Sequence, residues 1–141
     1  MATPFASPDE FREVMDRILR LMSEDPEIGP RLRAADVPRR FEFDDVHLML
    51  NVRAARPGER ANLWWTWDEE IDWTPRVRMT MSSETANRYF QGRENMAMAI
   101  ARRQIRATGD LKAALVILPL IKPVFASYRR MIAADYPHLE L

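Results

Sequence analysis

The stretch GRENMAMAIARRQIRATGD, residues 92–110, decides the fold that we expect for this chain. It begins with Gly92, continues as a short helix, becomes extended around Ile105 and ends in the turn Thr108-Gly109-Asp110, which opens a further helix. No part of it has the spacing of a catalytic motif. The stretch therefore predicts a compact supersecondary unit and favours a binding protein over an enzyme.

The residues before this unit predict a sheet. Apolar and polar side chains alternate in four segments, as in antiparallel strands with one buried face. We expect the four strands to follow one another as a meander, with a fifth strand in the unit described above. The segments lie at about residues 40–43, 48–53, 63–67, 76–81 and 104–108.

Helices are expected on either side of the sheet in the sequence. Ser7-Pro8-Asp9-Glu10 is typical of a helix start, and an apolar stripe follows it until the helix ends before Pro26. A short helix over about residues 26–35 comes next, and a serine-capped helix runs up to Gly92. The C-terminal helical region to about residue 135 should be broken or kinked near two prolines, Pro119 and Pro123.

Composition indicates one folded domain over residues 1–141. The chain is 47% hydrophobic and 30% charged, and its 21 basic and 21 acidic residues cancel, which argues against a nucleic-acid partner. It has no cysteine, which excludes disulfides, thiolate metal ligands and a cysteine nucleophile. We therefore predict an α+β fold in the cytoplasm: a five-stranded, mostly antiparallel sheet covered on one face by N-terminal and C-terminal helices.

Membrane insertion is not expected. The N-terminus lacks the basic and apolar regions of a secretory signal. The longest apolar run, residues 113–121, is far shorter than the roughly twenty residues that span a bilayer, and it contains Pro119. We expect at most transient contact with a membrane surface, where a basic rim at Arg102, Arg103 and Arg106, with Arg129 and Arg130, would meet anionic head groups or remain a solvated surface.

Catalytic and metal-binding patterns are missing from the sequence. The acidic residues 68–72 lack the spacing of a calcium loop and are interpreted as a solvated hairpin loop. His47 and His138 show no triad pattern, and His138 should be exposed. We predict no metal, no cofactor and no enzymatic activity.

From Val77 to about Leu118 the chain resembles the sterol-carrier-protein lipid-transfer family. The likeness lies in the strand end Met79-Thr80-Met81-Ser82, the helix running to Phe90 and Gly92, and the unit from Asn95 and Ala99 through Ile105 to Gly109-Asp110. The order of helices and strands before it matches the α+β sandwich of the family. The chain departs from the pattern at Arg103, where the family commonly has glycine, and in an extra C-terminal helix.

The resemblance implies an apolar tunnel between the sheet and the C-terminal helices, which would hold a fatty acyl chain, an acyl-CoA or a sterol-like molecule. Asn95, Arg103 and Arg106 would orient its head group. The positions that carry over to the tunnel wall are Trp65, Met79, Met81, Phe90, Ile100, Ile105, Leu115 and Leu118.

Two alternatives stay open. The apolar run 113–121 and the inward tryptophans Trp65 and Trp67 are equally typical of a filled core. The protein would then be a structural or interaction module, and a homodimer could use the outward Trp64. The third hypothesis is an enzyme, or the accessory half of one, that acts on a hydrophobic substrate with His47 or a buried carboxylate as base, and no sequence feature favours it.

Overall fold

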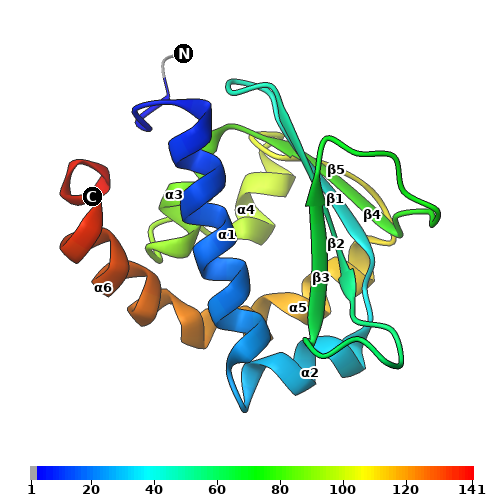
Figure 1. Ribbon diagram of the computed structural model, residues 1–141. Helices are drawn as coiled ribbons and strands as arrows, with labels where there is room; N and C mark the ends of the chain where they lie inside the picture. Colours follow the sequence, from blue (N-terminus) through cyan, green and yellow to red (C-terminus); the bar gives the residue numbers. More distant parts are fainter. Residues whose placement is uncertain (1–2) are drawn as a thin grey trace.

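A five-stranded sheet with helices on one face forms the body of the computed structural model, which describes residues 3–141 (Figure 1). This confirms the expected α+β class. The strands are β1 (Arg39–Phe43), β2 (Leu48–Ala54), β3 (Leu63–Trp67), β4 (Val77–Met81) and β5 (Arg106–Gly109). The helices are α1 (Pro8–Glu24), α2 (Ile28–Ala35), α3 (Ser83–Phe90), α4 (Met96–Ala101), α5 (Leu111–Ile121) and α6 (Phe125–Asp135), with 3₁₀ turns η1 (Lys122–Val124) and η2 (Pro137–Leu139).

α1 begins at the predicted cap. The Ser7 hydroxyl accepts a hydrogen bond from the Glu10 amide (3.1 Å), and the Glu10 carboxylate accepts one from the Ala6 amide (3.0 Å). The helix ends at Glu24, before Pro26, as expected. Its apolar stripe is fully buried against the sheet, so α1 forms one wall of the core: Phe11, Val14, Met15, Ile18, Leu19 and Met22.

The sheet order is β3-β2-β1-β4-β5, and this corrects the expected four-strand meander. β1, β2 and β3 do form a meander, and β4 pairs antiparallel with β5. β4, however, lies parallel to β1, with Met79 opposite Phe41. Three of the four pairings are therefore antiparallel, and the sheet is mixed.

The segment between β3 and β4 makes the parallel pairing possible, because it crosses the face of the sheet that carries no helices (Figure 1). Trp73 in this segment packs edge-on against Trp64, with ring centroids 6.5 Å apart. Asp72 accepts a hydrogen bond from Arg56 (3.2 Å). The Arg76 amide then donates to the Pro38 carbonyl, which places β4 beside β1. The acidic residues 68–72 thus belong to a crossover, and the hairpin expected there is wrong.

The C-terminal helical region is less interrupted than its prolines indicated. Asp110 caps α5 through a bond from the Ala113 amide (3.1 Å), and α5 continues through Pro119. The expected kink is the 3₁₀ turn η1, at which the chain changes direction between α5 and α6 (Figure 1). The joined stretch Leu111–Asp135 is long and apolar enough to cross a membrane by length and composition, which the nine-residue run did not indicate. Core helices of soluble proteins meet the same criterion.

Candidate functional site

An apolar cavity lies between the helix-covered face of the sheet and helices α1, α3 and α5. Every second side chain of β1, β2 and β4 points into it, because alternate residues of a strand share a face. The sheet contributes Phe41, Phe43, Leu50, Val52, Met79 and Met81. The helices contribute Met15, Ile18, Leu19, Met22, Ala86, Phe90, Met96, Ala114, Ile117, Leu118 and Ile121.

The cavity is small, with a volume of about 70 Å³. Ligand pockets usually measure about 300–1,000 Å³, and an engineered cavity of about 150 Å³ holds benzene. Side chains therefore fill most of the space between the sheet and the helices. A long-chain ligand would enter only if these side chains or a helix moved.

Methionine is prominent in the lining. Five of the nine methionines of the chain contact the cavity. Methionine is unbranched and has three rotatable bonds, so it fills irregular space and repacks at low cost. The lining is therefore adaptable. These residues are Met15, Met22, Met79, Met81 and Met96.

A surface groove of about 520 Å³ adjoins the cavity. Tyr89, Met96 and Leu118 line both spaces, so these side chains lie between the cavity and the groove. The outer part of the groove lies between the α3–α4 loop and the end of α5. It is formed by Gly92, Arg93, Glu94, Asn95, Pro119, Lys122 and Phe125.

Among residues 3–141, two polar side chains line the cavity, Arg39 and Tyr89. Arg39 is 5% exposed, and its Nη1 donates to the Val37 carbonyl (2.8 Å). Burial lowers the pKa of Arg39 to about 10, although the charge of nearby Tyr89 would raise it, so the guanidinium stays charged at neutral pH. Tyr89 is 7% exposed. Burial raises the pKa of Tyr89 to about 12, against the opposing effect of Arg39.

Four of the predicted wall residues line the cavity: Met79, Met81, Phe90 and Leu118. Their ligand contacts remain a prediction. Sequence reasoning missed Arg39 and Tyr89, as well as the contribution of α1. The signal for Arg39 was its position two residues before Phe41 on the inward face of β1.

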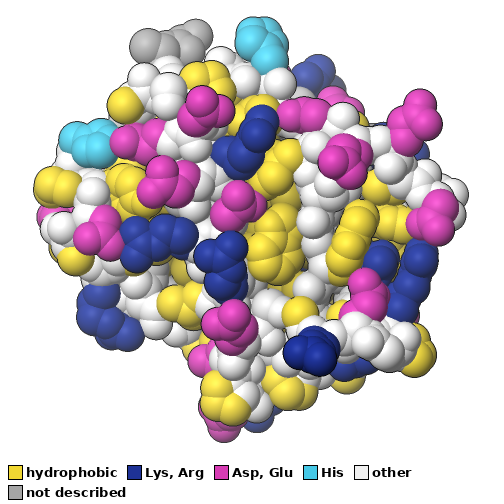
Figure 2. Space-filling view, viewed as in Figure 1, with side chains coloured by type: hydrophobic (Ala, Val, Ile, Leu, Met, Phe, Trp, Pro, Cys, Tyr) yellow, Lys and Arg dark blue, Asp and Glu magenta, His cyan; other side chains and the backbone are white. Residues whose placement is uncertain are grey.

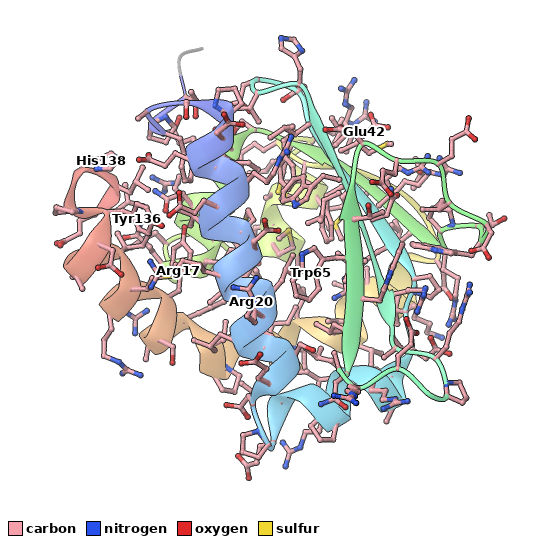
Figure 3. The ribbon with its side chains drawn as sticks, in the orientation of Figure 1. Arg17, Arg20, Glu42, Trp65, Tyr136 and His138 are labelled. Atoms are coloured by element: carbon pink, nitrogen blue, oxygen red, sulfur yellow. The ribbon has the colours of Figure 1, made fainter. Side chains whose placement is uncertain are left out.

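The other four predicted wall residues lie elsewhere. Trp65 points from β3 toward α1, where its indole N–H donates to the Asp16 carboxylate (3.0 Å; Figure 3). Ile105 is buried just before β5, and Ile100 is half-buried in α4. Leu115 is 47% exposed on the outer side of α5. These four side chains contribute to packing or to the surface rather than to the cavity.

Tryptophan side chains also reach the surface next to Trp65. Figure 2 shows hydrophobic side chains exposed between α1 and β3, with charged side chains on both sides. Trp67 is half-buried there and donates to the same Asp16 oxygen (2.7 Å), with the Arg12 guanidinium 5.9 Å from its ring centroid. The two tryptophans thus attach β3 to α1. This is the packing role that the filled-core alternative assigned to them.

The residues expected to orient a head group do not face the cavity as a set. The Asn95 side chain caps α4, because its Oδ1 accepts a hydrogen bond from the Met98 amide (3.0 Å). Arg103 and Arg106 are exposed. Arg103 has a φ of 62°, in the left-handed region that glycine adopts most easily, and it stands where the family commonly has glycine.

The histidines and acidic residues form no metal site in the described range, since no three of them are grouped as ligands there. His138 is half-exposed, and its Nε2 lies 2.8 Å from the Glu10 carboxylate. Together with Tyr136, which donates to Glu13 (2.6 Å) and contacts Arg17, it attaches the C-terminus to α1 (Figure 3).

Comparison with solved structures identifies the fold. UbiJ-SCP2, a ubiquinone synthesis protein, superposes with a TM-score of 0.58 at 13% identity, covering 86% of this chain and 94% of its own. Sterol carrier protein 2 from Yarrowia lipolytica, in its apo form, gives 0.54 at 10% identity, covering 77% and 87%. The fold is that of sterol-carrier-protein domains. It confirms the architecture expected from residues 92–110.

The same fold also matches part of a larger enzyme. The stereoselective inverting sec-alkylsulfatase Pisa1 from Pseudomonas sp. superposes over 72% of this chain with a TM-score of 0.57 at 16% identity, and the chain spans only 15% of that enzyme's length. No family model matches the sequence, and no curated protein matches it. These similarities show a shared fold.

Proposed function

We propose that this protein binds a lipid-like molecule in the cavity between the sheet and α5, and carries it within the cytoplasm. The ligand would be a fatty acyl chain, an acyl-CoA or a sterol-like compound. The observation that supports the proposal is the continuous apolar lining, which is interrupted only by Arg39 and Tyr89. Each Å² of apolar ligand surface removed from water there would contribute about 25 cal/mol.

Entry of such a ligand requires the cavity to enlarge. α5 is the element best suited to move, because it is apolar on its inner side and also exposes Leu111, Leu115 and Val116. Displacing α5 would join the cavity to the groove at Leu118, and the five lining methionines would repack around the ligand. The exposed apolar side of α5 would also permit brief contact with a membrane surface during loading.

A module with a filled core is the second candidate, and the cavity volume of about 70 Å³ favours it. In that case a second copy of the chain could pack against the outer face of the sheet at Trp64, as the sequence suggested, and no ligand would be taken up. Both candidates are non-catalytic. They differ in whether the cavity beside Ala114 can bind a ligand.

A single substitution tests the proposal. Ala114 lines the cavity from α5, so Ala114→Leu places additional carbon atoms in the space that the ligand needs. We expect about tenfold or more weaker binding of a fluorescent fatty acid, because several methylene groups of the ligand lose their buried position. Titration followed by fluorescence measures the affinity.

The matched control is Ala133→Leu, the same change at an exposed position of α6. It should bind like the wild type. Both variants must keep the far-ultraviolet circular dichroism of the wild type. Unchanged binding by a folded Ala114→Leu protein would remove the cavity as the binding site.

A further inference from the structure

Arg39 is placed where the alternation of β1 expects a hydrophobic residue. It is the first residue of the strand and shares the inward face with Phe41 and Phe43. Its strand partners on either side are Val52 and Val77, which are fully buried. A buried cation thus lies at the boundary of an apolar cavity.

The charge of Arg39 has no counterion within residues 3–141. None of the ion pairs formed there includes it, and its one hydrogen bond goes to the backbone carbonyl of Val37. A guanidinium carries five N–H donors in a rigid plane, so most of them remain free to bind an oxyanion. Buried cations in proteins are normally paired, and an unpaired one is strongly unfavourable.

Tyr89 supplies a second donor beside the same cavity. Its hydroxyl is buried in α3 and finds no hydrogen-bond partner among the described residues. Arg39 and Tyr89 line the same cavity, and the charge of Arg39 acts to lower the pKa of Tyr89. Tyr128, the neighbouring buried tyrosine, instead donates to Asn87 (2.7 Å). Of the five buried side-chain atoms in the described chain that lack a hydrogen-bond partner, the Tyr89 hydroxyl is the one whose residue lines the cavity.

We propose that Arg39 and Tyr89 bind the oxyanion head group of the ligand, so that the protein selects amphiphiles ending in a carboxylate or sulfate. This inference rests on the proposed function. The planar guanidinium matches two oxygens of such a group in a bidentate arrangement, and the tyrosine hydroxyl donates to one of them. The hydrocarbon chain then lies along the methionine-rich lining.

Selectivity follows from the buried charge. An alcohol of the same chain length fills the same apolar space and leaves the guanidinium unpaired. A carboxylate or sulfate neutralises it. The ligand thus supplies the counterion that the described chain lacks.

The experiment compares lauric acid, lauryl sulfate and lauryl alcohol by isothermal titration calorimetry, at concentrations that keep the protein folded. Wild type should bind the two anions about ten- to a hundredfold more tightly than the alcohol, as expected for hydrogen bonds to a charged group. Arg39→Met should lose this preference and bind the alcohol as before. Tyr89→Phe should weaken binding of the anions a few fold.

The matched control is Arg78→Met, because Arg78 lies in the neighbouring strand β4 on the opposite, exposed face. It should keep the preference for anions. Equal affinities of wild type for acid and alcohol, unchanged in Arg39→Met, would overturn the head-group inference and leave the binding function intact. If a folded Arg39→Met protein binds neither the anions nor the alcohol, Arg39 has a structural role, and this result would also overturn the head-group inference. If the wild type binds none of the three compounds, the result would instead contradict the proposed function.

Should Arg39→Met not fold, Tyr89→Phe decides the inference alone. Its hydroxyl has no partner to lose within the described chain, so the fold should tolerate the change. Unaltered binding of lauric acid and lauryl sulfate by this variant would then count against the site.

Discussion

Tyr89 and Tyr128 show how two buried residues of one type can have opposite effects on stability. The Tyr128 hydroxyl donates to Asn87, while the Tyr89 hydroxyl is buried without a partner in the described chain. An unsatisfied buried hydroxyl costs about 1–3 kcal/mol. We therefore expect Tyr89 to lower the stability of the empty protein.

Replacing each tyrosine with phenylalanine tests this difference. Tyr128→Phe should lower the free energy of unfolding by about 0.5–1.5 kcal/mol, because a hydrogen bond is lost, whereas Tyr89→Phe should leave it unchanged or raise it. Urea unfolding at neutral pH measures both values. Equal destabilisation by the two substitutions would contradict the conclusion that the Tyr128 hydroxyl has a hydrogen-bond partner and the Tyr89 hydroxyl has none.

The pH dependence of Tyr89→Phe has a definite sign. The folded-state pKa of Tyr89 is raised to about 12, above the unfolded value of about 10. Between these values the unfolded chain releases a proton that the folded chain retains, so the contribution of Tyr89 to stability is lost as pH rises. Tyr89→Phe lacks this ionisable group, so its free energy of unfolding relative to wild type should rise between about pH 10 and 12.

Single residues also show what the sequence could and could not predict about the site. Met79 and Met81 were correctly placed on the inward face, because strict alternation fixes the face of a strand residue. Arg39 was missed because the strand was expected to start at Arg40, one residue late. Trp65 was misplaced because alternation gives its face, while its contact with Asp16 depends on the position of α1.

At the scale of elements, the turn between β5 and α5 depends on Gly109. Its φ is +93°, and a Cβ atom there would clash with the Arg76 carbonyl oxygen of the neighbouring strand. Asp110 caps α5 immediately afterwards and is hydrogen-bonded to Arg76 (2.6 Å). The turn therefore fixes both the edge strand and the helix that closes the cavity.

Gly109→Ala should thus destabilise the protein by more than the roughly 1–2 kcal/mol of a left-handed residue alone. Gly58→Ala is the control, because Gly58 has a similar φ of +92° with open space around it. Gly58→Ala should lower the free energy of unfolding only by the cost of placing alanine in a left-handed conformation. Thermal unfolding of both variants gives the comparison, and equal losses would show that the contact with Arg76 is unimportant.

Local signals predicted the helices and strands well, and strand pairing less well. The cap at Ser7 was predicted by residue, because it is a side-chain bond within four residues. The next cap was predicted as Ser82 or Ser83 and is Ser82, and the predicted turn at Gly109-Asp110 does open α5, with Asp110 as its cap. The parallel pairing of β1 with β4 was not readable, because it depends on the crossover that packs Trp73 on Trp64. Such a contact is not encoded in alternation.

At the scale of the whole molecule, function depends on how the sheet and α5 enclose space. The chain folds as sterol-carrier-protein domains do, and the lining of its cavity is apolar except at Arg39 and Tyr89. The cavity is smaller than a lipid-like ligand, so the proposed binding would require movement of α5 and repacking of the methionines. Composition and periodicity could predict an apolar interior, but cavity volume depends on the packing of many side chains at once.

Native mass spectrometry of the wild-type protein incubated with lauric acid, an acyl-CoA and a sterol tests the central claim most directly. The account predicts that the 16.5 kDa chain appears with one bound ligand, released by organic extraction, and that Ala114→Leu largely loses this complex. A wild-type spectrum containing only the bare chain or its dimer would contradict it.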